Sequence, residues 1–492
     1  VADSLVKNER ETQFDNSAVE RMADEFSRWA YVNPERADRI VAAFNEKVNV
    51  VRTRSYSGTK YFRQVGADPG IPLRTNQKDG AWRMMVSQST LLHHAVGVGK
   101  TYTAIAAIME RKRLGLSNKA AVAVPKHVLS QWARSWYALY PAANILVADE
   151  RDFNAENRRK LIARIATGDY DGILIGHTSL KFIENEPTDV ADIICNQIQE
   201  FEEAAEEAKR NGESGRTVAA IAKRAEKLHE RLTEMEKTIS RDRMGFSFTQ
   251  IGIDYLVVDE SQEYKNLEYT TATRQLVGMN NPVGSQRAFD MFIKVRGLLS
   301  RGFGVAFLSG TPISNSLVEI YVIMKYLAYD TLKEMGLLHY DAWASTFVEA
   351  KIRFEYTATG RVMERNVLSG LINLGPLSEI YKSFTDIILR KDMIRLYEEQ
   401  IAQENRRDGT SRSTRFPVPR ISGGGRQLIT IPPSPDHEEY TSYLVRRMNG
   451  IKRNTGFKDY PKIDNPLWVL TDARKASIDI RTVDPHAVRH EH

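Results

Sequence analysis

Several features that the sequence lacks narrow the class of protein. It has a single cysteine, Cys195, so no disulfide can form within the chain, and a reducing, intracellular location is the simplest interpretation. No apolar run approaches the ~18 residues of a membrane span. The polar, charged stretch Val1–Arg10 is not a signal peptide. We therefore expect a cytoplasmic protein with no membrane partner.

A strong charge of one sign is also absent. Lys and Arg number 69 and Asp and Glu 63, which gives a net charge of +6 over 492 residues. This balance permits a polyanionic partner without requiring one. With 42% hydrophobic and 27% charged residues, the chain is typical of a globular protein of about three domain-sized units. It starts with Val1 rather than Met, so we expect it to be part of a longer protein.

The pattern of apolar runs predicts an α/β fold with helical N- and C-terminal segments. A helical segment at 1–70 precedes an α/β lobe at 71–330, where strand-like and helical stretches alternate and so predict a parallel sheet. A helical extension is expected at 331–415, and 416–492 is expected to start a second, incomplete lobe with two short strands. The strands expected in the α/β lobe are Thr90–Leu92, Ala120–Val124, Ile145–Ala148, Gly172–Ile175, Ile253–Asp259 and Val305–Ser309.

Residues 190–243 interrupt this alternation with two helical arms. Apolar residues recur every three or four positions on either side of the breaker Asn211–Gly215. They are Ile194, Ile198, Phe201, Ala205 and Ala208 in the first arm, and Ile221, Ala225, Leu228, Leu232, Met235 and Ile239 in the second. The pattern predicts an inserted antiparallel coiled-coil hairpin. It is either a solvated strut or an arm that contacts a partner or DNA.

The strongest local pattern is a glycine-rich turn between a strand and a helix, running from His94 through Gly97 and Gly99 to Lys100 and Thr101. Glycines at such a turn let backbone N–H groups face a phosphate chain, and the helix N-terminus adds a favourable dipole. Lys100 would reach the β- and γ-phosphates of ATP, and the Thr101 hydroxyl would bind Mg²⁺. The strict pattern has glycine where this chain has His94, so a tight turn with a solvated lysine is the alternative.

Two later strands also end in polar clusters. Asp259 and Glu260 follow the first, where one carboxylate would hold the metal and the next would activate water for attack on the γ-phosphate. Ser309 and Thr311 follow the second, and their hydroxyl groups could relay hydrogen bonds. The alternative is purely structural, because the end of a strand followed by the N-cap of a helix has the same sequence pattern.

The order of these motifs resembles that of superfamily 2 helicases and translocases, most closely the chromatin-remodeller (Swi/Snf) branch. That branch does not require the distant first glycine, which removes the objection raised by His94. The resemblance implies a recombinase-like P-loop domain that uses ATP and Mg²⁺. It places Gln77 in the adenine-reading motif and Gln262 where the family has histidine. It also implies that Gln262, Ser309 and Thr311 couple the nucleotide site to the rest of the motor.

Two more stretches resemble the motifs that contact nucleic acid in this superfamily. Val124-Pro125-Lys126 is similar to motif Ia, and His177-Thr178-Ser179 lies in a stretch similar to motif Ib. The resemblance implies that Lys126, Thr178 and Ser179 contact the sugar–phosphate backbone of DNA. We expect duplex DNA that is bound without regard to its sequence.

Further stretches, such as Gln77–Arg83 and Gly284–Phe289, look like DarB-type phage and plasmid antirestriction proteins, in which a helicase module often follows an adenine methylase. The sequence has no Asn/Asp-Pro-Pro-Tyr/Phe methylase motif, so methyl transfer is not predicted. It also has no Gln-x-x-Gly-Arg-x-x-Arg motif after Thr311. We therefore expect the second recombinase-like lobe to be a partner in cis or in trans, and this chain alone to bind ATP but to hydrolyse it poorly.

The main hypothesis is an ATP-dependent DNA translocase or helicase in a phage or mobile-element antirestriction or defence setting. Two alternatives belong to other classes. One is a nucleic-acid-binding scaffold whose nucleotide site is inactive or switch-like, and the other is a P-loop ATPase that acts on protein.

Overall fold

A computed structural model gives the fold of the chain. It describes residues 22–48 except 23, 24, 27 and 31, then 56–154, 156–210, 246–269, 282–356, 362–411, 432–452 and 465–483, with isolated positions within 215–233 and at 271, 279, 413 and 414. The chain divides into two compact units. The first is Val1–Glu349 with Ser369–Arg412, and the second is Ala350–Leu368 with Ser413–His492.

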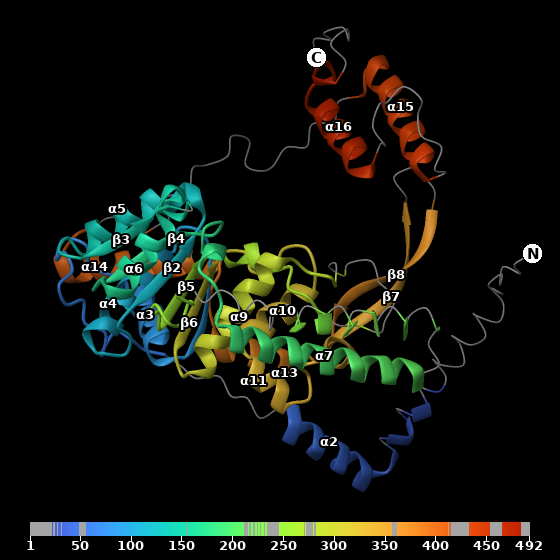
Figure 1. Cartoon of the computed structure of the whole chain (residues 1–492), viewed down its shortest axis with the longest axis horizontal. Helices are drawn as coiled ribbons and strands as arrows, with labels where there is room; N and C mark the ends of the chain where they lie inside the picture. Colours follow the sequence, from blue (N-terminus) through green and yellow to red (C-terminus); the bar gives the residue numbers. More distant parts are fainter. Residues whose placement is uncertain are drawn as a thin grey trace, which may run out of the picture. The chain divides into compact units, whose positions relative to one another are not determined.

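A seven-stranded parallel sheet forms the centre of the first unit, in the order β3-β4-β2-β5-β6-β1-β9 (Figure 1). The strands are β1 Ser89–His94, β2 Ala120–Val124, β3 Ile145–Ala148, β4 Gly172–Gly176, β5 Tyr255–Asp259, β6 Gly304–Ser309 and β9 Thr385–Ile388. All but β9 lie where the sequence predicts them, and the α/β class with a parallel sheet is confirmed.

Helices cover both faces of this sheet. α3 Thr75–Val86, α4 Lys100–Arg113 and α5 Leu129–Leu139 pack with alternate strand residues, such as Val122 and Val257, in one core. On the opposite face lie α9 Gln286–Ser300 and α10 Val318–Leu327, where the rings of Phe307 and Tyr326 are 5.3 Å apart. Because the central strands β2, β4, β5 and β6 are buried on both faces, they are continuous apolar runs rather than alternating ones.

The stretch 331–415 contains strands as well as the predicted helices. Its helices are α12 Tyr340–Phe347, α13 Leu374–Phe384 and α14 Arg390–Asp408, preceded by α11 Tyr329–Glu334. β7 Val348–Tyr356 and β8 Val362–Leu371 form a separate two-stranded sheet. β9 instead joins the edge of the main sheet beside β1, with Leu92 paired to Asp386. The described residues of this stretch are thus helical with three added strands, and the predicted domain boundaries stay a prediction.

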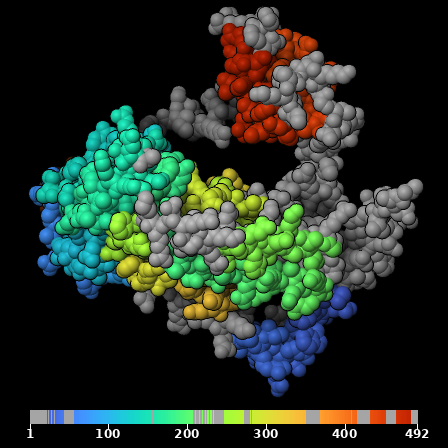
Figure 2. Space-filling view, viewed as in Figure 1, coloured from blue at the N-terminus to red at the C-terminus, as the bar shows by residue number. Residues whose placement is uncertain are grey.

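The first predicted arm of the coiled coil is the helix α7 Pro187–Arg210, which forms part of the surface in Figure 2. Its predicted apolar stripe is buried, with Ile194, Ile198 and Phe201 at most 5% exposed. Most of the second arm lies outside the described residues, although His229 approaches Glu202 of α7 at 3.6 Å. The hairpin therefore stays a prediction. The remaining helices of this unit are α2 Pro34–Val48, which agrees with the predicted N-terminal helix, and α6 Arg158–Thr167.

The described part of the second unit is largely a helical pair, α15 Pro435–Lys452 and α16 Pro466–Ile478. Leu444, Met448 and Val469 form its small core, and Arg447 donates a hydrogen bond to Asp472 at 2.8 Å. The two strands predicted at 418–431 lie outside the described residues, so the predicted second lobe is untested. None of the helices in the described part of the chain is long and apolar enough to cross a membrane.

Candidate active site

The predicted phosphate loop joins the end of β1 to the start of α4. Gly97 and Gly99 adopt φ angles of +90° and +99°, a left-handed conformation that disfavours any residue with a side chain. A Cβ atom at Gly99 would also collide with the side-chain amide of Gln77. Both glycines are therefore required by the backbone of the loop, and backbone of this kind can turn several N–H groups toward one anion.

Lys100 begins α4 and its ammonium group is held inside the loop. Its Nζ donates a hydrogen bond to the carbonyl oxygen of His94 at 2.9 Å. Burial lowers the pKa of Lys100, while the nearby carboxylates of Asp259 and Glu260 act in the opposite direction. Thr101 follows in the first turn of the same helix. The lysine charge is thus in contact with the loop and close enough to both carboxylates to interact with them.

Asp259 ends β5 and is only 8% exposed. Its Oδ2 accepts a hydrogen bond from the indole N–H of Trp132 at 2.8 Å, and its Oδ1 accepts from the backbone N–H of Glu260 at 3.1 Å. Burial raises the pKa of Asp259, and the bond from Trp132 opposes that shift. The carboxylate is therefore oriented through both oxygens.

Glu260 has φ +50° and ψ +50°, a left-handed conformation that is rare for a residue with a side chain. Such a conformation costs of order 1–3 kcal/mol and is found at functional sites when the surroundings enforce it. Here the surroundings include Gln262, whose Nε2 donates to Glu260 Oε2 at 2.6 Å. The strained residue is thus the predicted base itself, directly after the predicted metal ligand Asp259.

The three predicted coupling residues form one hydrogen-bonded chain with Glu260. Ser309 Oγ, at the end of β6, donates to Gln262 Oε1 at 2.6 Å, and the backbone N–H of Thr311 donates to Ser309 Oγ at 3.1 Å. Gln262 thus uses its oxygen toward Ser309 and its nitrogen toward Glu260. An amide can do both at once because it carries an acceptor and donors.

Gln77 lies against the loop itself. It is 6% exposed, its Oε1 accepts from the backbone N–H of Arg74 at 2.9 Å, and its Nε2 donates to the carbonyl of Gly99 at 3.4 Å. The structure therefore brings Gln77 to the nucleotide site. Its role in reading adenine stays a prediction.

Sequence reasoning missed a support under the loop that comes from β9. His94 Nε2 is 2.6 Å from Asp386 Oδ2, and since a carboxylate only accepts, this nitrogen carries the hydrogen. The backbone N–H of Ala95 donates to the carbonyl of Ile388 at 2.8 Å. Met393 Sδ lies 4.0 Å from where a Cβ at Gly97 would stand. No local signal in the short run Thr385–Ile388 could have revealed this contact.

The predicted nucleic-acid residues follow the neighbouring strands β2 and β4. Val124 pairs with Gly176, so Lys126 and Thr178 leave the same edge of the sheet, and both are exposed. Lys126 Nζ pairs with Glu150 at 2.5 Å, a surface ion pair of little net strength. Ser179 is only 2% exposed, so its side chain lies beneath this surface.

His177 connects this surface to the nucleotide site, and sequence reasoning gave it no role. Its Nε2 is 2.8 Å from the carbonyl oxygen of Asp259 and its Nδ1 is 2.7 Å from the hydroxyl of Tyr264. Burial, with the charge of Arg287 adding to it, lowers the pKa of His177 to about 4. The neutral ring therefore donates to Asp259 and accepts from Tyr264.

The parallel sheet, the loop after β1 and the carboxylates after β5 define a P-loop nucleotide-binding domain. Residues 82–388 match the family described as "Probable helicase domain", which is more than half of the chain, and the chain belongs to this family.

One curated relative is the "Defense against restriction protein B" of Escherichia phage P1, which is 23% identical over 433 residues, covering 80% of this chain and 19% of the relative. This chain thus spans about a fifth of that relative's length. The resemblance to DarB-type proteins is confirmed.

Two solved structures are also similar. The Sulfolobus solfataricus SWI2/SNF2 ATPase core in complex with dsDNA has 16% identity and a TM-score of 0.34, with 82% of this chain and 58% of that chain covered. The core domain alone has 18% identity and a TM-score of 0.31, covering 61% and 42%. The α/β fold of this chain is established by its own seven-stranded parallel sheet.

Proposed function

We propose that this chain is the ATP-hydrolysing motor of a DNA translocase that acts in a phage or mobile-element antirestriction or defence setting. The observation that supports it most is the chain of hydrogen bonds from Glu260 through Gln262 to Ser309 and Thr311. It joins the predicted base of hydrolysis to a strand that a motor would use to transmit the state of the nucleotide. The phage relative's name supports the setting.

The residues present suit a magnesium–nucleotide complex. Thr101 and Asp259 offer hydroxyl and carboxylate oxygens, the ligands that Mg²⁺ prefers. Lys100 is held by a carbonyl oxygen rather than by a close carboxylate, which leaves its charge for phosphate. Bound at this site, Mg²⁺ would neutralise charge on the phosphate oxygens.

Glu260 is the proposed general base for hydrolysis. It accepts a proton from the attacking water as oxygen bonds to the γ-phosphorus and the bond from that phosphorus to ADP breaks. Gln262 holds Oε2 of Glu260, which leaves Oε1 for the water. As the bond to ADP breaks, negative charge shifts onto the ADP phosphates, and Lys100 stabilises this charge.

Lys126 and Thr178 are the proposed contacts to DNA. Both are exposed at the ends of adjacent strands, as a surface that follows a sugar–phosphate backbone requires. Contacts of this type position a protein on DNA without reading its bases. His177 lies between this surface and the carbonyl of Asp259, so we propose that it helps to couple DNA binding to hydrolysis.

The test is phosphate release with and without duplex DNA, measured together with ATP binding and with DNA affinity over a range of salt concentrations. Because the chain spans about a fifth of its curated relative, both this chain and a longer protein that contains it are assayed. We expect DNA to stimulate release by the longer protein, and Glu260→Gln to abolish that release. We expect this chain alone to bind ATP but to hydrolyse it poorly, with or without DNA. ATP binding and salt-dependent DNA affinity without turnover in either protein would indicate the scaffold instead. Turnover without any DNA affinity would indicate an ATPase that acts on protein.

A further inference from the structure

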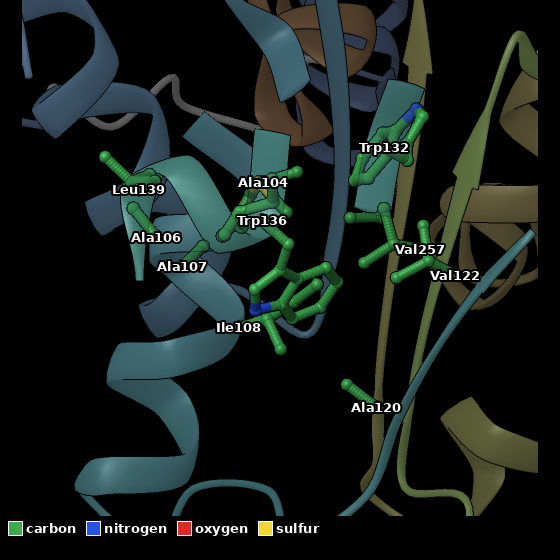
Figure 3. Packing of buried hydrophobic residues seen from close by; sticks show 14 of the residues in the cluster. Ala104, Ala106, Ala107, Ile108, Ala120, Val122, Trp132, Trp136, Leu139 and Val257 are labelled. Atoms are coloured by element: carbon green, nitrogen blue, oxygen red, sulfur yellow. The ribbon is translucent and has the colours of Figure 1, made fainter. Parts of the chain in front are cut away.

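Helix α5 carries two buried tryptophans one turn apart, Trp132 and Trp136, which are 2% and 0% exposed (Figure 3). Trp132 Nε1 donates to Asp259 Oδ2 at 2.8 Å. Trp136 packs against Gly172 and beside Ile108, and its Nε1 has no hydrogen-bond partner in the described part of the chain. The two rings therefore share a helix and a core but differ in one hydrogen bond to the nucleotide site.

That hydrogen bond suits a carboxylate that must hold a cation. An indole N–H only donates and stays neutral, so it orients Asp259 without cancelling its charge, as a lysine or arginine partner would. The backbone N–H of Glu260 occupies the other oxygen. Each oxygen has two acceptor positions, so one bond to each leaves room for a metal ion.

Geometry also connects Trp132 to the proposed DNA surface. α5 begins at Leu129, directly after the short helix Lys126–Val128 that carries Lys126. Trp132 lies in the first turn of α5 and reaches across to the end of β5. Trp132 therefore lies on the same continuous segment of backbone as Lys126 and contacts Asp259 directly.

We propose that Trp132 is a positioning residue for magnesium, whose indole N–H holds Asp259 in the orientation that binds the metal–nucleotide complex. The proposal rests on the proposed function, since it assumes that nucleotide and Mg²⁺ bind at this site. Hydrogen-bond partners of metal ligands typically change metal affinity by about 10–100-fold when they are removed.

The experiment compares Trp132→Phe with Trp136→Phe in the full 492-residue chain. Both variants lose a similar volume from the same core, but only Trp132→Phe removes a donor to Asp259. A non-hydrolysable ATP analogue is titrated by calorimetry, once with Mg²⁺ and once with EDTA. We expect Trp132→Phe to weaken binding about 10-fold or more with Mg²⁺ and to leave binding in EDTA close to that of Trp136→Phe.

Two outcomes overturn the proposal: equal affinities of the two variants with Mg²⁺, or an equal loss for Trp132→Phe with and without Mg²⁺, which would indicate a purely structural role. Should Trp132→Phe fail to fold, replacement of Trp132 by 3-benzothienylalanine keeps the ring size and removes the N–H, and the same expectation applies. Wild-type protein that binds no nucleotide under either condition would overturn the proposed function and this inference together. Normal wild-type binding with no effect at Trp132 would overturn this inference alone.

Discussion

The edge of the sheet where the motifs gather has two halves that are built differently. In the nucleotide half, at the ends of β1, β5 and β6, Asp259, Gln262 and Ser309 are hydrogen-bonded to groups of other motifs. In the nucleic-acid half, at the ends of β2 and β4, Lys126 and Thr178 are exposed, and among the residues that the structure describes Lys126 forms a surface ion pair with Glu150. Bond breaking at phosphorus needs reacting groups in fixed positions, whereas a backbone contact tolerates a mobile side chain. Substitutions in the nucleotide half should therefore have larger effects than substitutions in the nucleic-acid half.

The largest effect is expected at the base of the nucleotide half. Glu260→Gln keeps the size of the side chain but cannot accept a proton. In the longer protein that contains this chain, phosphate release should therefore fall by about 10²–10⁴-fold while ATP binding is retained. Glu263→Gln is the matched control, because Glu263 pairs with Arg287 at the surface instead. Turnover that survives in Glu260→Gln would assign the base to another residue.

Lys100→Ala should weaken ATP binding by roughly tenfold or more, about 1.4 kcal/mol, because it removes the charge that offsets the phosphates. Lys112→Ala lies on the same helix but pairs with Asp169 and Asp171, and it should leave ATP affinity unchanged. Titration calorimetry on both variants measures this. Unchanged ATP binding in Lys100→Ala would show that the phosphate-loop interpretation is wrong.

A buried lysine beneath the nucleic-acid half should make the stability of the protein depend on pH. Lys294 lines a small cavity with His177 and Lys181, and burial lowers its pKa to about 8, with Asp290 opposing the shift. The unfolded chain, with the ordinary pKa of 10.5, therefore binds more protons between pH 8 and 10.5, and wild-type stability should rise with pH in that window. Below pH 8 the lysine is charged in both states and the folded state carries the full cost.

Lys294→Met should consequently raise the free energy of unfolding at pH 7 by about 1–2 kcal/mol, after allowance for the lost hydrogen bond to Asn185. The gain should shrink as the pH approaches 10. Urea denaturation at a series of pH values measures both quantities. A gain that is independent of pH would mean that Lys294 is not the titrating group.

Asp386→Asn tests the support that β9 gives to the phosphate loop. The amide oxygen can still accept from His94, but the bond loses its charge, so ATP affinity should fall by only about two- to fivefold. The effect should be the same for ATP and ADP, because the loop contacts phosphates common to both. Wild-type affinity in Asp386→Asn would show that backbone pairing of β9 alone supports the loop.

The smallest effect is expected in the nucleic-acid half. Lys126→Ala should weaken DNA binding about equally for all sequences and reduce the salt dependence by about one counterion. Lys333→Ala, an exposed lysine of α11, gives the same change in net charge and should have no such effect. A loss confined to one DNA sequence would contradict a backbone contact at Lys126.

The sequence alone predicted most of the sheet, and it named most of the residues that the structure brings together in the candidate nucleotide site. Buried parallel strands are short apolar runs that differ sharply from the helices between them, so β2, β3 and β6 were predicted nearly to the residue. Chemistry that requires a fixed order of small and charged residues also leaves a local pattern, and that pattern predicts Lys100, Asp259 and Glu260 as site residues.

Tertiary structure decided the contacts between segments far apart in the chain. Asp386 meets His94 across 292 positions and Trp132 meets Asp259 across 127, and neither partner carries a local pattern that names the other. His177 meets the carbonyl of Asp259 because β4 and β5 lie on either side of β2 in the sheet, and the burial of Ser179 likewise appears only in the folded chain. A short motif in the sequence predicts the backbone turn that a site requires. Which side chain holds a carboxylate in place depends on where the sheet brings distant strands together, and only the folded chain contains that information.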